Sequence, residues 1–210
     1  MQLQIMADRS KTTSRGFTLL ELMVVLVIMG ILATQVVTAF TSPATKVKGA
    51  AFNMRSDFNL ARAEAVNRNS NILVDFVFDT DLDGDGDADD GYWICLDDDD
   101  SSSCEAGDTT IRKVTLPDEV EFYDTDYTGG PAVEPGGGSL TVEDGVDFTA
   151  DRFAMQPNGT SNKGGTVYIY TPEPDGTGMQ VPPYAVVVSP TTGRVRLSIW
   201  KTASSTWSTK

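Results

Sequence analysis

The longest hydrophobic pattern in the chain is an apolar run over residues 16–40 that contains one charged residue, Glu21. As a helix rising about 1.5 Å per residue, residues 17–40 would be about 36 Å long, enough to cross a hydrocarbon layer of about 30 Å. This length predicts a transmembrane helix. A carboxylate in such a segment is costly, so Glu21 is expected to have a cationic partner or to lie in the first helical turn, where the helix dipole favours an anion.

A second helical pattern follows Pro43, which kinks the first helix or begins a new one because it lacks a backbone N–H. Apolar residues then recur at alternating spacings of four and three, which places them on one helix face. The members of this stripe are Val47, Ala51, Met54, Phe58, Ala61 and Ala65. We therefore predict an amphipathic helix over residues 41–71, packed on a globular domain and ending among residues 67–71, where Asn can cap in the left-handed conformation.

The rest of the chain, residues 72–210, shows short runs of β-branched and aromatic residues separated by Gly- and Pro-rich turns. The runs are residues 72–78, 92–96, 111–116, 120–123, 152–155, 166–171, 184–189 and 194–200. This succession predicts an α+β protein with a long N-terminal helix packed on an antiparallel β-sheet or small β-sandwich. An acidic loop is expected over residues 79–108.

Composition argues against an enzyme. The chain has no His, so a Ser-His-Asp or Cys-His arrangement is impossible, and no phosphate or dinucleotide loop motif occurs. We predict no catalytic residues. The net charge is −14, and residues 1–16 carry +2, so their removal would leave −16. That balance argues against non-specific adhesion to nucleic acid or anionic lipid.

The residues at the start of the apolar run, RGFTLLELM from Arg15 to Met23, closely resemble the type IV prepilin signal. The resemblance implies a basic leader peptide over residues 1–16, cut between Gly16 and Phe17 by a prepilin peptidase that also N-methylates Phe17. It further implies that subunits assemble into a filament through these helices. After the cut, the new α-amino group of Phe17 is a cation that can pair with Glu21 of a neighbouring copy.

An ordinary secretory signal peptide is the competing interpretation of the same stretch. Val37 and Ala39 fit a small-residue cleavage pattern just before Phe40. The apolar region is, however, longer than the 7 to 15 residues typical of such peptides and contains a charge. The prepilin interpretation is therefore favoured.

A second resemblance lies further along. The string ARAEA at residues 61–65, followed by NRN at residues 67–69, resembles the helix end of the GspH/FimT family of minor pseudopilins and minor pilins. It implies a structural subunit that initiates or caps a type II secretion pseudopilus or a type IV pilus. The implied partners are other pilin subunits, prepilin peptidase and the inner-membrane assembly platform. The implied location is the bacterial inner membrane, single-pass, with a periplasmic or cell-surface domain. A major pilin is the alternative within this class.

The chain has two cysteines, Cys95 and Cys104, in a domain expected outside the cytoplasm, which suggests one disulfide. It would close a small loop whose acidic residues repel one another. Two free thiols are the alternative. Metal ligation by this pair is not expected, because the chain has no His and no Cys-x-x-Cys.

Arg194 and Arg196 lie in a strictly alternating run, so Val195, Leu197 and Ile199 are expected to face the core and both arginines the solvent. The Gly-Arg-x-Arg string that begins at residue 193 resembles a C-terminal motif of the FimT branch associated with DNA uptake, which makes a DNA-binding or other ligand-binding pilin an alternative function. An exposed strand with two solubilising arginines is favoured, since two phosphate contacts provide little affinity and the net negative charge repels a polyanion.

Residues 79–90, DTDLDGDGDADD, have the spacing of a calcium loop. The predicted ligands fall at positions 1, 3, 5, 7, 9 and 12, with Gly84 at position 6: Asp79, Asp81, Asp83, Asp85, Asp87 and Asp90. The last is Asp where a bidentate Glu is usual, and a second register, starting at Asp81, places Tyr92 at position 12. The alternative is a solvated acidic turn. Calcium is favoured as the one cofactor, because residues 79–108 hold thirteen acids and no base.

Overall fold

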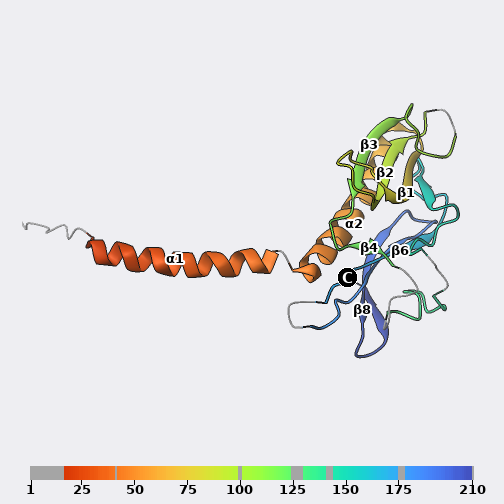
Figure 1. The fold of residues 1–210 in the computed structure, drawn as a ribbon. Helices are drawn as coiled ribbons and strands as arrows, with labels where there is room; N and C mark the ends of the chain where they lie inside the picture. Colours follow the sequence, from red (N-terminus) through yellow and green to blue (C-terminus); the bar gives the residue numbers. More distant parts are fainter. Residues whose placement is uncertain are drawn as a thin grey trace, which may run out of the picture. The chain divides into compact units, whose positions relative to one another are not determined.

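The computed structural model describes residues 17–40, 42–98, 101–123, 130–140, 144–174 and 178–209. The predicted leader peptide and Gly16 therefore lie outside the described residues. The chain divides into two compact units, Met1–Ala39 and Phe40–Lys210. Helix α1, Leu19–Phe40, makes up most of the described part of the first unit (Figure 1).

Helix α2, Pro43–Arg68, begins a new helix at Pro43, which resolves the two possibilities left open for that proline. Ser42 is extended, and its carbonyl oxygen accepts the N–H groups of Thr45 and Lys46. Proline fits the first helical turn because its missing N–H would have no intrahelical partner there. The helix ends where Asn69 adopts the left-handed conformation (φ 53°) and donates its N–H to the Ala65 carbonyl, as predicted for this segment.

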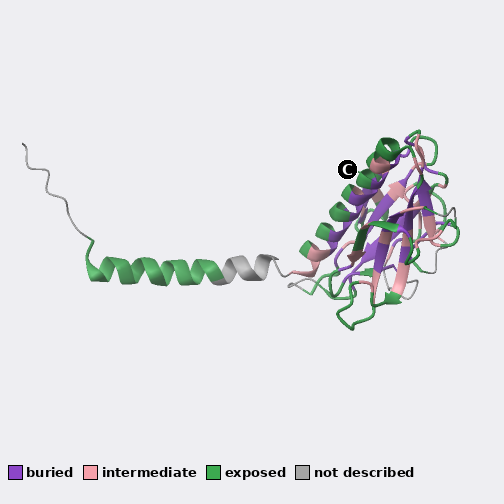
Figure 2. Ribbon diagram, turned by 90° about the horizontal axis from the view of Figure 1, so that it is seen from above, coloured by how far each residue is buried: buried purple, intermediate pink, exposed green. Residues whose placement is uncertain are grey.

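The predicted apolar stripe of α2 is confirmed. All six of its members are fully buried, and Ala50 joins them with 6% of its surface exposed. The buried face contacts strands of both sheets described below. Figure 2 shows the opposite side of α2 exposed along the flank of the β domain. Packing of one face, rather than helix propensity alone, therefore holds this helix in place.

Within the described residues, nine strands form two sheets in which every strand pair is antiparallel. The first sheet has the order β3-β2-β1-β5 and the second β4-β6-β7-β8-β9. The strands are β1 Ile72–Thr80, β2 Asp89–Leu96, β3 Thr109–Thr115, β4 Glu121–Phe122, β5 Arg152–Met155, β6 Gly165–Tyr170, β7 Tyr184–Val188, β8 Val195–Lys201 and β9 Thr206–Thr209. Each of the eight predicted runs overlaps one of these strands, and the α+β prediction is confirmed. Only β9 was not predicted.

One hydrophobic core joins α2 to both sheets. At its centre the ring of Phe58, from α2, meets three aromatic rings edge-on, with centroid distances of 6.0 Å to Phe76, 5.8 Å to Tyr92 and 5.2 Å to Phe153. Edge-to-face pairs at these distances are favourable beyond the area that they bury. The aromatic cluster therefore fixes the helix against the first sheet.

A buried carboxylate, Asp57, lies beside this cluster on the same face of α2 and is 3% exposed. It accepts a hydrogen bond from the Tyr92 hydroxyl at 2.7 Å and pairs with Arg112 of β3 at 3.1 Å. Burial and the bond to Asp57 raise the pKa of Tyr92, so Tyr92 stays a donor. The sequence patterns assigned no role to Asp57, and the structure shows that it links α2 to two strands.

Residues 79–108 were expected to form an acidic loop, although the run at residues 92–96 within them was also predicted as a strand, and the bounds of the loop need correction. Strand β2, Asp89–Leu96, runs through its middle and pairs with β1 and β3. The buried positions Tyr92, Ile94 and Cys95 explain why this part is a strand. The stretch therefore forms two acidic loops. The first acidic loop connects β1 to β2, and the second acidic loop connects β2 to β3.

Candidate functional site

The N-terminus of α1 is capped by Thr18. Its hydroxyl oxygen accepts the N–H of Glu21 at 3.2 Å, and its carbonyl oxygen accepts the N–H of Leu22 at 3.1 Å. Glu21 is exposed and lies in the first turn, where the helix dipole favours a carboxylate. The geometry therefore supports a local role for Glu21. Its pairing with the amine of Phe17 in a neighbour stays a prediction, and Gly16 lies outside the described residues.

Large apolar side chains cover the described part of α1 and are exposed. Phe17 is 85% exposed, Leu19 77% and Met29 62%, and the other large apolar residues through Leu32 are between 43% and 72% exposed. A surface of this kind on a soluble monomer marks a region that another molecule or lipid covers. Within the part of the chain that the structure describes, no helix has both the length and the apolar character required to cross a membrane.

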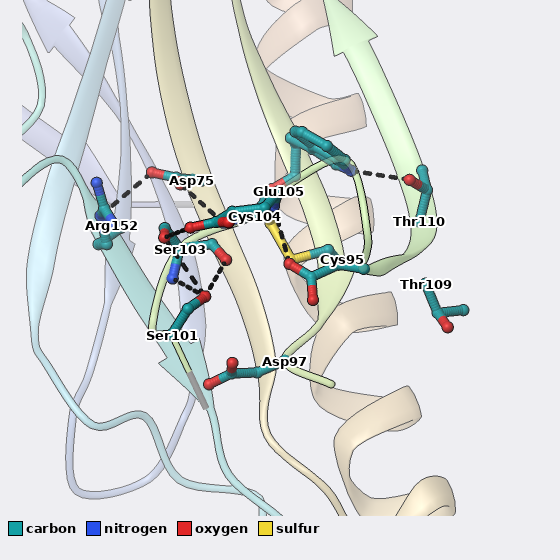
Figure 3. Close-up of a disulfide and its surroundings, with 12 residues drawn as sticks. Asp75, Cys95, Asp97, Ser101, Ser103, Cys104, Glu105, Thr109, Thr110 and Arg152 are labelled. Atoms are coloured by element: carbon teal, nitrogen blue, oxygen red, sulfur yellow. Dashed lines mark hydrogen bonds and ion pairs between the residues drawn. A yellow bond between two sulfur atoms is a disulfide. The ribbon is translucent and has the colours of Figure 1, made fainter. Parts of the chain in front are cut away.

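Cys95 and Cys104 form a disulfide, which confirms the predicted pairing (Figure 3). Cys95 is buried near the end of β2, and the pair packs with Leu73, Trp93 and Ala154. The bridge holds the second acidic loop against the side of the first sheet opposite the main core. The loop is closed further by Asp108, whose carboxylate accepts the N–H groups of Glu105 at 2.8 Å and Asp98 at 3.3 Å.

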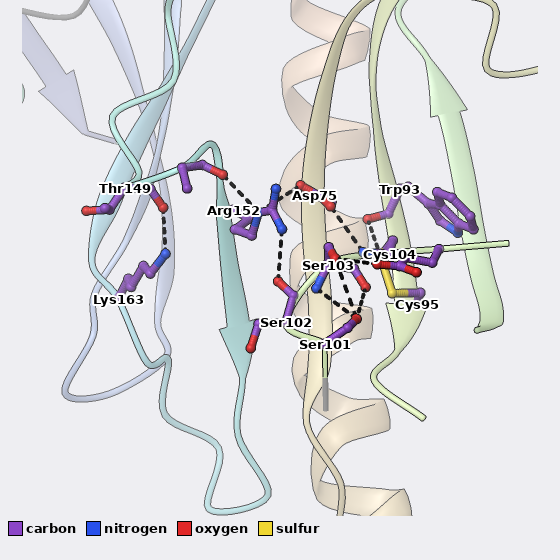
Figure 4. A network of polar contacts seen from close by, with 12 residues as sticks. Asp75, Trp93, Cys95, Ser101, Ser102, Ser103, Cys104, Thr149, Arg152 and Lys163 are labelled. Carbon is purple, nitrogen blue, oxygen red and sulfur yellow. Dashed lines mark hydrogen bonds and ion pairs between the residues drawn. A yellow bond between two sulfur atoms is a disulfide. The ribbon is translucent and has the colours of Figure 1, made fainter. Parts of the chain in front are cut away.

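A polar network fastens the disulfide loop to the sheet (Figure 4). Asp75 of β1 accepts the N–H of Cys104 at 3.1 Å and pairs with Arg152 of β5 at 3.4 Å. Arg152 in turn donates to the carbonyl oxygen of Ser102 at 3.1 Å. Burial raises the pKa of Asp75, although the Cys104 N–H and Arg152 oppose that rise. The pairing of Asp75 with Arg152 was not predicted, although a charged Asp75 inside an apolar strand was a usable signal.

The first acidic loop brings together three of the six predicted calcium ligands. Carboxylate oxygens of Asp81, Asp83 and Asp85 all lie within 4.8 Å of one another, and the three side chains are exposed. Each also accepts a loop N–H, from Gly84, Asp85 and Asp87 respectively. Calcium takes six to eight oxygen ligands, so three converging carboxylates could supply part of a calcium site that water or carbonyl groups would complete.

The other predicted ligands, Asp79, Asp87 and Asp90, lie outside this group. Asp90 is half-buried, and its carboxylate accepts the N–H groups of Phe122 at 2.9 Å and Asp79 at 3.4 Å, so it joins β2 to β4. The three grouped residues are ligand positions in both registers, and the first register loses its first and last ligands, Asp79 and Asp90. The second register begins at Asp81. Its position 12 is Tyr92, whose hydroxyl is buried and bonded elsewhere, so the loop lacks the closing bidentate ligand of an EF-hand.

The surroundings of this loop are strongly acidic. A hollow of about 530 Å³ beside it is lined by carboxylates that include Asp89, Asp90, Asp118, Glu121 and Asp144. Partial burial and the charges of Asp85, Asp118 and Asp87 raise the pKa of Asp89, and burial raises that of Asp90. Repulsion among these groups would be relieved by a bound cation.

Arg194 and Arg196 are both exposed, as predicted, and Val195 and Leu197 are buried. Arg196 borders a hollow of about 330 Å³ that Glu134 and Asp147 also line. These acids weaken any site for a polyanion. A role in ligand or DNA contact stays a prediction.

Ser198 is on the same side of β8 as the two exposed arginines, but it is buried. Ser198 is 1% exposed and Trp200 4%. The missed strand β9 explains the difference, because Trp207 packs against Trp200 with ring centroids 5.4 Å apart. The Trp207 indole also donates to the carbonyl oxygen of Val133 at 2.6 Å, which places a further segment on this face.

Comparison with known proteins places these features in a class. Residues 11–34 match the model of the prokaryotic N-terminal methylation motif, and residues 50–193 match the model of the type II transport protein GspH. The motif and the fold define a type IV prepilin-like protein. The second match covers more than half of the chain, and the chain belongs to the GspH family.

No curated protein matches the chain. Among solved structures, the chain is similar to one described as the minor pseudopilin EpsH from the Type 2 Secretion System of Vibrio cholerae. The two are 13% identical with a TM-score of 0.40, and the match covers 72% of this chain and 95% of that one.

Proposed function

We propose that the chain is a minor pseudopilin, a structural subunit of a type II secretion pseudopilus. The observation that carries this is the joint match of one chain to the methylation motif at residues 11–34 and to the GspH model at residues 50–193. The exposed apolar surface of α1 supports it, because a filament or a membrane would cover that surface. In this proposal α1 first anchors the protein in the inner membrane, with the β domain in the periplasm, and then enters the filament.

Maturation follows from the same proposal. Prepilin peptidase cuts between Gly16 and Phe17 and methylates Phe17, and the inner-membrane platform then adds the subunit to the filament, where it initiates or caps assembly. The subunit is structural and performs no catalysis. Deletion of the gene, scored for secretion and for pilus number, separates this function from a type IV pilus role.

Glu21→Gln is expected to leave membrane insertion and cleavage intact and to abolish most incorporation into filaments, because it removes the charge that would pair with the Phe17 amine. Glutamine at this position can still take part in helix capping, so the variant changes charge rather than helix start. Thr18→Ala is the matched control: it removes the observed cap and keeps the carboxylate. Incorporation is measured by immunoblotting sheared filaments. Normal incorporation of the Gln variant would defeat the pairing, and equal loss in both variants would assign the effect to capping.

We further propose that Asp81, Asp83 and Asp85 bind calcium, with an affinity on the order of 0.1 to 1 mM. The carboxylate convergence at 4.8 Å supports this. Calcium should raise the melting temperature of the parent chain at pH 7 and give a measurable heat of binding. Asp81→Ala with Asp83→Ala should remove both effects, and Glu173→Ala, an exposed acid outside the loop, should keep them. If millimolar calcium gives neither a heat of binding nor a shift in the melting temperature of the parent chain, the loop is only a charged linker and the proposal is wrong.

The raised pKa values of Asp89 and Asp90 give the same experiment a pH dependence. A carboxyl with a higher pKa in the folded state stabilises the fold below its unfolded pKa, and that stabilisation is lost as pH rises through the folded pKa. The metal-free chain should therefore gain stability as pH falls from 7 toward about 4. Calcium should give less stabilisation at the acidic end, because protons then compete for the loop.

A further inference from the structure

The side of α2 that faces away from the sheets is exposed (Figure 2). Along this side runs a continuous stripe of uncharged residues, which we call the outer seam. Its members are all exposed and follow one another at alternating spacings of four and three residues: Thr45, Gly49, Phe52, Ser56, Asn59, Ala63 and Val66. This spacing keeps a row of side chains on one side of a helix and is the spacing by which two helices pack along their length. The buried stripe of α2 has the same spacing on the opposite side.

Large apolar surface is exposed on and beside the outer seam. Phe52 is 41% exposed, Val66 53% and Leu60 37%. At the C-terminal end of the helix, a hollow of about 530 Å³ is bordered by Ala63 and Val66 together with polar neighbours. Apolar side chains next to a hollow are suited to receive the side chains of a partner.

Gly49 gives an independent indication of close approach. It lies inside α2, where Gly is less favourable than Ala, yet nothing in the described structure lies within 4 Å of the place where its Cβ would stand. The fold of this chain therefore gives no steric reason for a glycine. Its smallness would let a second backbone come close to α2.

A basic ridge runs along one edge of the outer seam. Lys48, Arg55 and Arg62 follow one another at seven-residue spacing. Lys48 and Arg55 make no ion pair among the described residues, and Arg62 donates to the carbonyl oxygen of Gly159 at 2.8 Å. Helix α2 carries five basic and two acidic residues, in a chain of net charge −14. The ridge thus offers cations to whatever packs on the seam.

We propose that the outer seam binds a helix of a different filament subunit, one with its own uncharged seam and with Asp or Glu beside it at seven-residue spacing. This inference rests on the proposed function as a filament subunit. Charge complementarity selects the partner. A second copy of α2 does not supply the acids, because Asp57 is buried against Arg112 and Glu64 is paired with Arg68. The structure therefore favours a heterotypic contact.

The probe is a synthetic helical peptide with a seam of Ala and Leu and with Glu at the flanking seven-residue positions. A matched peptide carries Lys in place of Glu. Binding to the full chain in detergent micelles is followed by fluorescence anisotropy at low salt. The Glu peptide should bind about tenfold more tightly than the Lys peptide, since several exposed charge pairs act together. Lys48→Glu with Arg55→Glu should reverse this order, and Lys113→Glu with Lys201→Glu, on the β domain, should not.

Two further variants separate binding from folding. Gly49→Ala should raise the melting temperature of the chain, because the Cβ meets open space, and Gly49→Leu should weaken Glu-peptide binding at least fivefold without lowering the melting temperature. Ser56→Cys, at the centre of the seam, should not form a disulfide-linked dimer.

Equal binding of the two peptides by the parent chain, or an unchanged order in the Lys48 and Arg55 variant, would overturn the proposal. Efficient dimerisation of Ser56→Cys would also overturn it, by showing that a second copy is the occupant. The assay contains no filament, so its failure leaves the proposed function standing. The Glu21→Gln variant, in turn, tests that function and leaves the residues of the outer seam unchanged.

Discussion

Arg112→Leu is expected to lower the free energy of unfolding by about 3 kcal/mol, because it leaves the Asp57 carboxylate buried without a cation. The side chain of Asp57 is 5% exposed, whereas that of Arg112 is 48% exposed. Arg112 can therefore reach water when its partner is lost, and Asp57 cannot. Removing Arg112 and keeping Asp57 should therefore lower the free energy of unfolding more than removing the charge of Asp57 and keeping Arg112.

The difference between removing the acid and removing the base can be measured by urea unfolding of the two single variants, the double variant and a control variant. Asp57→Asn keeps an acceptor for the Tyr92 hydroxyl, and it should cost less than Arg112→Leu. Adding Asp57→Asn to Arg112→Leu should recover part of the loss, because the buried charge is gone. Lys113→Leu, the next residue on the same strand, lies over the Trp93 ring and should change stability little. A loss below about 1 kcal/mol in Arg112→Leu would show that water reaches Asp57.

Gly193→Ala is expected to destabilise the β domain by about 3 kcal/mol. Gly193 has a φ of +58°, which costs an L residue about 1 kcal/mol. Its Cβ would also overlap the carbonyl oxygen of Gly159, so the backbone of one of the two turns must move. The same carbonyl oxygen accepts the hydrogen bond from Arg62 of α2, and the move would loosen that contact as well.

Gly137→Ala is the matched control, because Gly137 also has a positive φ (+94°) but has open space where its Cβ would stand. Gly137→Ala should lower the free energy of unfolding only by the cost of the positive φ, roughly 1 kcal/mol. A Gly193→Ala loss no larger than that of the control would show that the two turns adjust freely. The result also affects how the Gly-Arg-x-Arg string is tested. If a Gly193 variant lost ligand binding, the cause would be the disturbed fold and not the loss of a direct contact with the ligand.

Residues that share one local element were predictable from sequence. The buried stripe of α2 and the left-handed cap at Asn69 follow from spacing and from local backbone preference, and the structure agrees with both. Strand β5 was predicted with its observed bounds, Arg152–Met155. Strand β9, Thr206–Thr209, was missed because its four residues contain one apolar side chain and no alternation.

The pairs that bind distant segments were not predictable. Asp75 and Arg152 face each other only because β1 and β5 are neighbours in one register. Asp57 occupies a buried position that the periodicity assigns to an apolar residue, and only the positions of Tyr92 and Arg112 explain a carboxylate there. The calcium loop shows the same limit: its spacing allowed two registers, and the grouping of Asp81, Asp83 and Asp85 depends on the fold of the turn.

The central claim is that the chain is processed as a prepilin before it enters a filament. Intact-mass analysis and N-terminal sequencing of the protein from membranes and sheared filaments test it most directly. We expect a chain that begins at Phe17 and carries one added methyl group, and a Gly16→Val variant that accumulates uncut. A mature protein that begins at Phe40, or filaments built from the uncut chain, would contradict it.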